Sequence, residues 1–163
     1  MLRKPTRCED DRYDALTVMI VLNPASERTA RAWRVGWAPV AVVGLHSALA
    51  ATVGHRRDLD PVFHFLGGAA GAFAVLNAIV FFPRQLSSLS AWNPWVVAIA
   101  AVVVAALLWE CGEFAADRVL GTHVQAGWLD TSIDLVLGTV GAAVVIVIAA
   151  FGRRHVGGTG PPA

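Results

Sequence analysis

Seven ionisable side chains in the second half of the chain lie within or beside stretches that are otherwise apolar enough to cross a membrane. They form three groups, namely Asp60 with His64, Glu110 with Glu113 and Asp117, and Asp130 with Asp134. A charged group is costly to place in hydrocarbon, so ionisable residues inside membrane segments mark candidate functional sites. Several carboxylates with a single imidazole are ligands that suit a divalent cation such as Zn²⁺ or Mn²⁺.

The elements that must position these residues are long apolar helices. Of the 163 residues, 56% are hydrophobic and only 15% are charged, whereas a soluble domain has about 25% charged residues. Four apolar segments have the length of about 20 residues that a bilayer requires. They cover residues 35–54, 61–82, 94–116 and 131–151. The predicted fold is therefore all-α, an integral membrane four-helix bundle.

This bundle is predicted to occupy residues 33–152, between a polar N-terminal tail (1–32) and a flexible C-terminal tail (153–163). The start of the chain lacks the apolar core of a cleaved signal peptide. The short apolar run 16–22 is too brief to span and is expected to be a locally ordered piece of the tail. Cys8 and Cys111 lie far apart in different predicted environments, which argues against a disulfide framework.

The arginines predict the orientation in the membrane. Six arginines lie at one predicted membrane face, namely Arg28, Arg31, Arg34, Arg84, Arg153 and Arg154. Three lie at the other face, namely Arg56, Arg57 and Arg118. Positive residues in short loops favour the cytoplasmic side, so both termini are predicted to be cytoplasmic. The net charge of only +1 gives no basic surface for nucleic acid. The bilayer is the expected partner.

With this topology, the three groups meet at the outer face of the membrane. Asp60 and His64 lie at the start of the 61–82 segment, and Asp130 and Asp134 lie at the start of the 131–151 segment. The group of Glu110, Glu113 and Asp117 lies at the end of the 94–116 segment. The spacing i, i+4 in the first and third groups places their members on adjacent turns of one helix face. The spacing i, i+3, i+7 in the second group gives a stripe about 60° wide. Such stripes are expected to face the bundle interior or a water-filled cleft.

Small residues would permit this convergence. Gly67 and Gly71 have the GxxxG spacing that allows close approach of membrane helices, with Gly68 between them. Gly138 and Gly141 are expected to act similarly beside Asp134.

Each polar residue also has a structural interpretation. Asp60 before Pro61, and Asp130, have the pattern of helix N-caps, and Asp117 with Arg118 has that of a surface ion pair. Capping does not explain the three residues inside the segments, His64, Glu110 and Asp134. Their alternative role is structural, as a hydrogen-bonded polar cluster that joins the helices. His46 is expected to be a packing histidine, and Asn77 to form an interhelical hydrogen bond.

The candidate ligands of one divalent metal, Zn²⁺ or Mn²⁺, are His64, Glu110, Glu113, Asp117 and Asp134. Glu110 and Glu113 are also candidate acid–base groups, and Asp60 and Asp130 are candidate caps or supports behind the ligands. Carboxyl groups crowded in a low-dielectric region tend to share protons, which makes Glu110 and Asp134 candidate proton carriers as well. The sequence has no G-x-S-x-G, H-E-x-x-H or phosphate-loop motif.

The order of these residues resembles the YjdF-type bacterial inner-membrane proteins over residues 55–145. The resemblance is carried by Asp60-x3-His64-Phe65-x-Gly67, Trp109-Glu110-x2-Glu113-x3-Asp117, Gly121-Thr122, Asp130-Thr131-x2-Asp134 and Gly141-Ala142. A remoter similarity connects it to the VanZ-like family, which is linked to glycopeptide resistance. The resemblance implies a multi-pass protein of the bacterial cytoplasmic membrane whose activity is undefined. The N-terminal tail is expected to have no counterpart, and the 123–129 segment is longer than in the family pattern and lacks its acidic residue.

Three functions agree with these residues. The first is a metal site facing outward that, in an enzyme, would act on an envelope lipid or lipid-linked substrate. The second is proton- or cation-coupled transport, which the Ala/Val/Ile-rich inner halves of the third and fourth segments disfavour. The third is a non-catalytic membrane protein whose polar knot fixes the packing of its helices.

Overall fold

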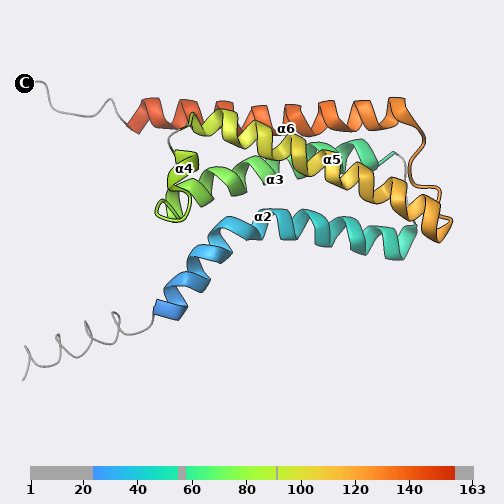
Figure 1. The fold of residues 1–163 in the computed structure, drawn as a ribbon, viewed down its shortest axis with the longest axis horizontal. Coiled ribbons are helices and arrows are strands. Elements are labelled where there is room, and N and C mark those ends of the chain that lie inside the picture. The colour runs from blue at the N-terminus through green and yellow to red at the C-terminus, as the bar shows by residue number, and fades with distance from the viewer. Residues whose placement is uncertain (1–23, 55–57, 91, 157–163) are drawn as a thin grey trace, which may run out of the picture. The chain divides into compact units, whose positions relative to one another are not determined.

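The computed structural model describes residues 24–54, 58–90 and 92–156. Its helices are α2 (Pro24–Val53), α3 (Asp60–Phe81), α4 (Ser87–Ser90), α5 (Pro94–Leu120) and α6 (Trp128–Val156) (Figure 1). These described ranges contain no β-strand. The predictions for residues 1–23 and 157–163, including Cys8 and the apolar run 16–22, fall outside them.

Four of the helices, α2, α3, α5 and α6, are long and apolar enough to cross a membrane, which confirms the predicted all-α membrane fold. Large apolar side chains are exposed on each of them, including Val43, Val80, Leu108 and Ile148. Such exposure suits a surface that faces lipid rather than water.

The helix bounds differ most from the sequence prediction at four places, one of which is the end of α6 at Val156 instead of near residue 151. Helix α2 begins at Pro24 instead of near residue 35, so the last part of the predicted tail is helical. Its first turns contain Ala, Glu and Arg, which are good helix formers, and Glu27 forms an ion pair with Arg31 at 3.1 Å. Helix α5 continues to Leu120, and α6 begins at Trp128.

Local sequence explains how α5 begins and ends. The side chain of Asn93 accepts a hydrogen bond from the backbone N–H of Trp95 at 2.9 Å. Pro94 follows at the first helical position, where a missing N–H removes no helical hydrogen bond. Gly121 ends the helix with a φ of 68°, a left-handed conformation that glycine adopts without steric cost.

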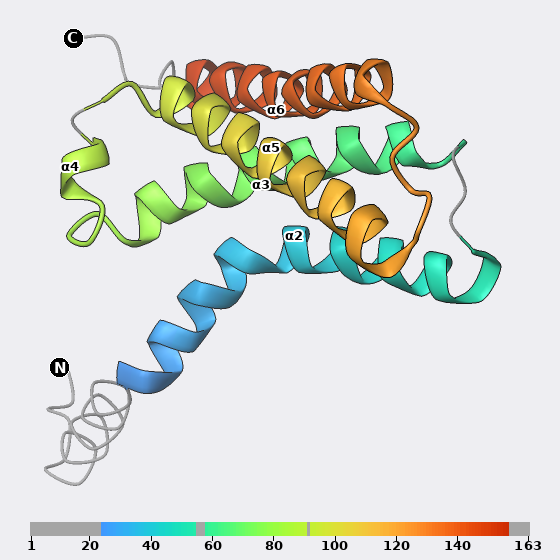
Figure 2. The same cartoon turned by 45° about the vertical axis from the view of Figure 1, so that its right-hand side comes forward.

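The chain divides into two compact units, Met1–Arg34 and Val35–Ala163. In the second unit, α3 lies beside α5 and α6 (Figures 1 and 2), and its most extensive contact is with α6. The core between these helices consists of small residues, namely Ala72, Ala98, Val102 and Ala142. Small side chains at the interfaces let the helix backbones approach closely, as in other membrane bundles.

The closest approach is between α3 and α6. A Cβ atom at Gly68 would overlap the backbone carbonyl of Gly138, and one at Gly141 would overlap the carbonyl of Phe65. The predicted pair Gly67 and Gly71 does not make this contact. A Cβ at Gly67 would meet no atom within 4 Å.

The prediction for Asn77 was wrong. Its Nδ2 donates to the carbonyl oxygen of Phe73, one turn earlier in the same helix, at 2.8 Å. The side-chain amide therefore bonds within α3 instead of joining two helices.

Candidate functional site

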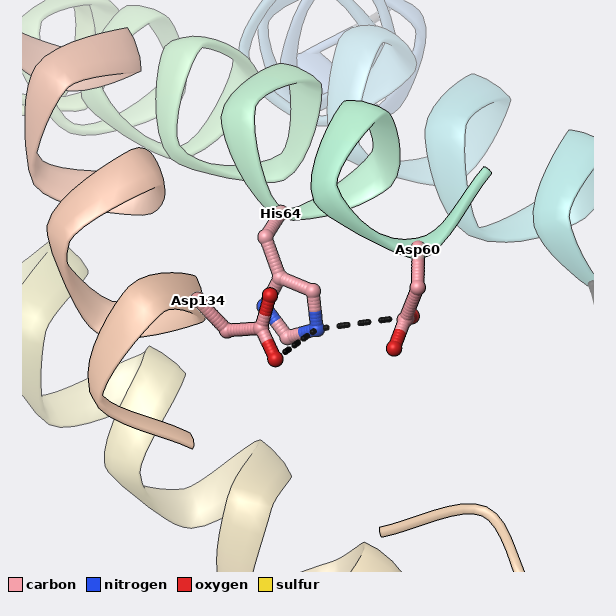
Figure 3. A group of neighbouring side chains, drawn as sticks. All are labelled: Asp60, His64 and Asp134. Carbon is pink, nitrogen blue, oxygen red and sulfur yellow. Dashed lines mark ion pairs between the residues drawn. The ribbon is translucent and has the colours of Figure 1, made fainter. Parts of the chain in front are cut away.

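Three carboxylates from three helices converge on one nitrogen of His64. The Nε2 atom of His64 lies 3.6 Å from Asp60 Oδ1, 3.8 Å from Glu110 Oε1 and 3.8 Å from Asp134 Oδ2. Figure 3 shows Asp60 and His64 one turn apart on α3, with Asp134 reaching the same nitrogen from α6. Glu110 completes the arrangement from α5. The structure thus brings together residues that are up to 74 positions apart in the chain (134 minus 60).

Glu113 lies at the edge of this group. Ligand atoms of His64, Glu110 and Glu113 lie within 4.8 Å of one another, as do those of Asp60, His64 and Asp134. The indole Nε1 of Trp109 donates a hydrogen bond of 2.8 Å to Glu113 Oε1, which fixes the position of this carboxylate. We refer to Asp60, His64, Glu110, Glu113 and Asp134 as the His64 cluster.

The inner carboxylates of the cluster are well buried. The exposed fractions are 7% for Asp60, 5% for Glu110 and 3% for Asp134. The Oε1 atom of Glu110 has no hydrogen-bond partner among the described residues, although it faces His64. A buried carboxylate oxygen without a hydrogen bond is energetically unfavourable. One imidazolium would neutralise only one of the surrounding negative charges, so the cluster has a strong attraction for a further cation, either a proton or a metal ion.

The spacing of the oxygens is compatible with a metal ion. Zinc bonds of about 2.0–2.1 Å to nitrogen and oxygen place the ligand atoms of a tetrahedral site about 3.4 Å apart. The ligand atoms of Asp60, His64 and Asp134 lie within 4.8 Å of one another, as do those of His64, Glu110 and Glu113, so either group of three would have to contract to reach that separation.

Asp60 has a different position from the predicted N-cap. Helix α3 begins at Asp60 itself, and Leu59 is its N-cap residue. The carboxylate of Asp60 is buried beside His64. Asp60 is therefore a member of the site and not only a support behind it.

Asp117, a predicted ligand, belongs to neither metal-compatible group among the described residues. Its carboxylate accepts hydrogen bonds from Thr122 Oγ1 at 2.6 Å and from the backbone N–H groups of Val124 and Gln125 at 2.9 and 3.0 Å. The neighbouring Arg118 places its guanidinium over the ring of Phe114, 5.0 Å from the centroid. Asp117 therefore holds the loop between α5 and α6.

Asp130 acts on the same loop from its other end. It lies in the first turn of α6 and accepts a hydrogen bond from the backbone N–H of Ala126 at 3.1 Å. This contact resembles the return bond of a capping box, in which an acidic side chain in the first turn binds an N–H group before the helix. The prediction that Asp130 is the N-cap was therefore wrong, because Asp130 lies inside the helix and bonds the backbone that precedes it.

A pocket of about 240 Å³ adjoins the His64 cluster. Asp60 and His64 line its polar part, and the rest of its wall is mainly apolar and comes from all four long helices. His46 also lines it, and its ring packs 4.8 Å from Phe63 and 5.7 Å from Trp109, centroid to centroid. The predicted packing role of His46 agrees with these contacts. Its place in the pocket wall was missed, because a single histidine in an apolar segment has no partner in the sequence pattern.

Comparison with protein families supports the resemblance to YjdF-type proteins. The model of the family described as "Predicted membrane protein (DUF2238)" matches residues 15–155. The match begins within the N-terminal segment, so the prediction that this whole segment lacks a counterpart was wrong for residues 15–32. No match is found among curated proteins or among solved structures, and the similarity to VanZ-like proteins stays a prediction. Because the match covers most of the chain, the protein belongs to the DUF2238 family of membrane proteins, the YjdF-like family.

Proposed function

We propose that the His64 cluster binds one divalent cation, Zn²⁺ or Mn²⁺, within the membrane domain. The observation that carries this proposal is the convergence of Asp60, Glu110 and Asp134 on a single imidazole nitrogen, with Glu110 Oε1 buried and without a hydrogen bond. A mixed set of carboxylate oxygens and one imidazole suits these metals. A bound cation would reduce the repulsion between the carboxylates and would give Glu110 Oε1 a partner.

The roles within the cluster differ. Asp60, His64 and Asp134 would be ligands, because their ligand atoms lie within 4.8 Å of one another. Glu110 would join them from α5, because its Oε1 lies 3.8 Å from His64 Nε2. Glu113 is half-buried and held by Trp109, so it would act as an acid–base group beside the cation. A divalent cation at such a site supplies Lewis-acid polarisation of a phosphoryl or carbonyl oxygen.

The proposed site faces the outside of the bacterial cytoplasmic membrane, and its substrate is an amphipathic lipid or lipid-linked molecule. The excess of arginines around the opposite ends of the helices supports the orientation. The apolar pocket beside the polar cluster supports the kind of substrate.

The test is a calorimetric titration of the purified, chelator-treated protein with Zn²⁺ and with Mn²⁺. We expect one binding site in the wild type and loss of that site in His64→Ala and in Glu110→Gln. Glu27→Gln and Cys111→Ser are matched controls, since Glu27 pairs with Arg31 and Cys111 is exposed. Size-exclusion chromatography would establish that each variant is folded.

Two results would contradict the metal site. One is a folded wild type that binds neither cation, and the other is a folded Glu110→Gln protein that binds it as tightly as the wild type. If the same substitutions only reduce the amount of folded protein, the cluster has a purely structural role in the packing of the helices. Transport is less well supported, because the buried core beyond the cluster is formed by the apolar residues Ala72, Ala98, Val102 and Ala142.

A further inference from the structure

We infer that the pocket beside the His64 cluster binds one hydrocarbon chain of a membrane lipid whose phosphate headgroup lies at the cluster. The position of the headgroup rests on the proposed cation site, since the cation would attract the phosphate. The position of the chain rests on the pocket alone. This inference assigns the substrate class as a phosphate-bearing lipid.

The pocket has the polarity that such a lipid requires. Its polar lining comes mainly from Asp60 and His64 of the cluster and from His46. The rest of the wall includes the backbone of Gly67 and Gly71 on α3 and the side chains of Ala105 and Ala106 on α5. A molecule that fills the pocket would therefore have an apolar body and one polar end.

The size of the pocket favours a single chain. A water molecule occupies about 30 Å³, and a methylene group has a similar volume, so 240 Å³ accommodates about eight such units. A single hydrocarbon chain is therefore of a size that the pocket accommodates.

Charge determines which lipid is favoured. A chain that leaves the bilayer for the pocket moves between two apolar surroundings, so the hydrophobic effect contributes little to binding. The attraction must then come from the headgroup. A phosphate would be repelled by the four carboxylates of the cluster alone, and it would bind when a divalent cation lies between them.

Gly67 offers a direct way to close the pocket. A Cβ added there meets no atom within 4 Å, so the side chain of Gly67→Leu can enter the pocket without disturbing the packing of α3 on α6. Ala106→Phe would fill the same space from α5. Gly44→Leu is the matched control, because Gly44 is an exposed helical glycine with equally open surroundings and does not line the pocket.

The experiment uses the full chain in lipid nanodiscs, loaded with zinc, and phosphatidic acid that carries a photoactivatable diazirine in one acyl chain. Cross-linked residues are mapped by mass spectrometry, and zinc content is measured on the same samples. We expect cross-links to concentrate on pocket residues such as Ala105 and Val102. Gly67→Leu and Ala106→Phe should reduce these cross-links to background while zinc is retained, and Gly44→Leu should leave both unchanged.

A diacylglycerol probe with the same diazirine chain tests the headgroup. It should give much weaker cross-linking in the pocket than phosphatidic acid. Cross-links spread over the lipid-facing surface, or cross-links that persist in zinc-loaded Gly67→Leu and Ala106→Phe, would overturn the chain site and leave the cation site standing. Cross-links that depend on Gly67 in a protein that binds no zinc would instead refute the proposed function and the headgroup position together.

Discussion

Aspartates at helix ends illustrate what residue type alone can and cannot predict. Asp60 and Asp117 both lie at the ends of apolar segments, and both could be caps, ion pairs or ligands by their sequence context. In the structure, Asp60 faces His64, whereas Asp117 accepts three hydrogen bonds from residues 122–125. The path of the adjoining loop decides between these roles, and that path is not encoded in the spacing of the acids.

The residues inside the segments were easier to predict. His64, Glu110 and Asp134 lie too far from helix ends to be caps, so they were predicted to meet one another between the helices. The structure does bring them together. Their polar character in an apolar helix is costly unless partners are present. That physical cost is what makes them recognisable in the sequence.

For Asp117, we predict that Asp117→Ala destabilises the protein without loss of cation binding. Removal of a charged acceptor with three hydrogen bonds should lower the free energy of unfolding, because Thr122 and the N–H groups of Val124 and Gln125 lose their partner. Thermal unfolding in detergent should show a lower midpoint, with a smaller decrease for Thr122→Val, which removes one of the bonds. If Asp117→Ala keeps its unfolding midpoint but no longer binds zinc, then Asp117 is a ligand after all.

At the scale of helices, the sequence predicts that glycines allow close packing, but it does not show which glycine is in contact. Gly67 and Gly68 are neighbours in sequence, and consecutive residues point about 100° apart around a helix. Both glycines line the pocket, but only at Gly68 would a Cβ overlap the backbone of Gly138. All three glycines of this stretch were expected to allow close approach; Gly68 does so toward α6, a Cβ at Gly71 would lie 3.2 Å from Val102 on α5, and Gly67 has open space.

This pair provides a stability test at adjacent positions. Gly68→Ala should destabilise the protein by about 1–3 kcal/mol or more, as overpacking does at a tight interface. Gly67→Ala should be neutral or slightly stabilising, because alanine has a higher helix propensity by about 1 kcal/mol. Thermal unfolding of both variants measures the difference. Equal destabilisation by the two substitutions would show that the helices do not approach at Gly68.

At the scale of the molecule, length and hydropathy were sufficient to predict four membrane helices, because the bilayer imposes a minimum apolar length. The helix ends were less predictable. Helix α2 extends to Pro24 through residues that are polar yet helix-forming, so a change in hydropathy did not coincide with a change in secondary structure. The pocket between helices depends on their relative placement, and no local pattern in the sequence indicated it.

The proposed orientation in the membrane leads to a labelling prediction. The α5–α6 loop lies at the end of the bundle opposite α4 (Figure 1), so His123 and Gln85 should be on opposite sides of the membrane. In a protein with Cys8→Ser and Cys111→Ser, a cysteine introduced by His123→Cys should react with a membrane-impermeant maleimide in spheroplasts. A cysteine from Gln85→Cys should react only after the membrane is permeabilised. The reverse pattern would place the His64 cluster at the cytoplasmic face.

The coordination of the cation by the His64 cluster can be measured by zinc X-ray absorption spectroscopy on the protein loaded with one equivalent of Zn²⁺. We expect nitrogen and oxygen ligands only, at about 2.0–2.2 Å, with the scattering of a single imidazole. Loss of the imidazole signal in His64→Ala and a changed ligand shell in Glu110→Gln should follow. A sulfur ligand at about 2.3 Å, or a shell of water oxygens that neither substitution alters, would contradict a metal site at His64.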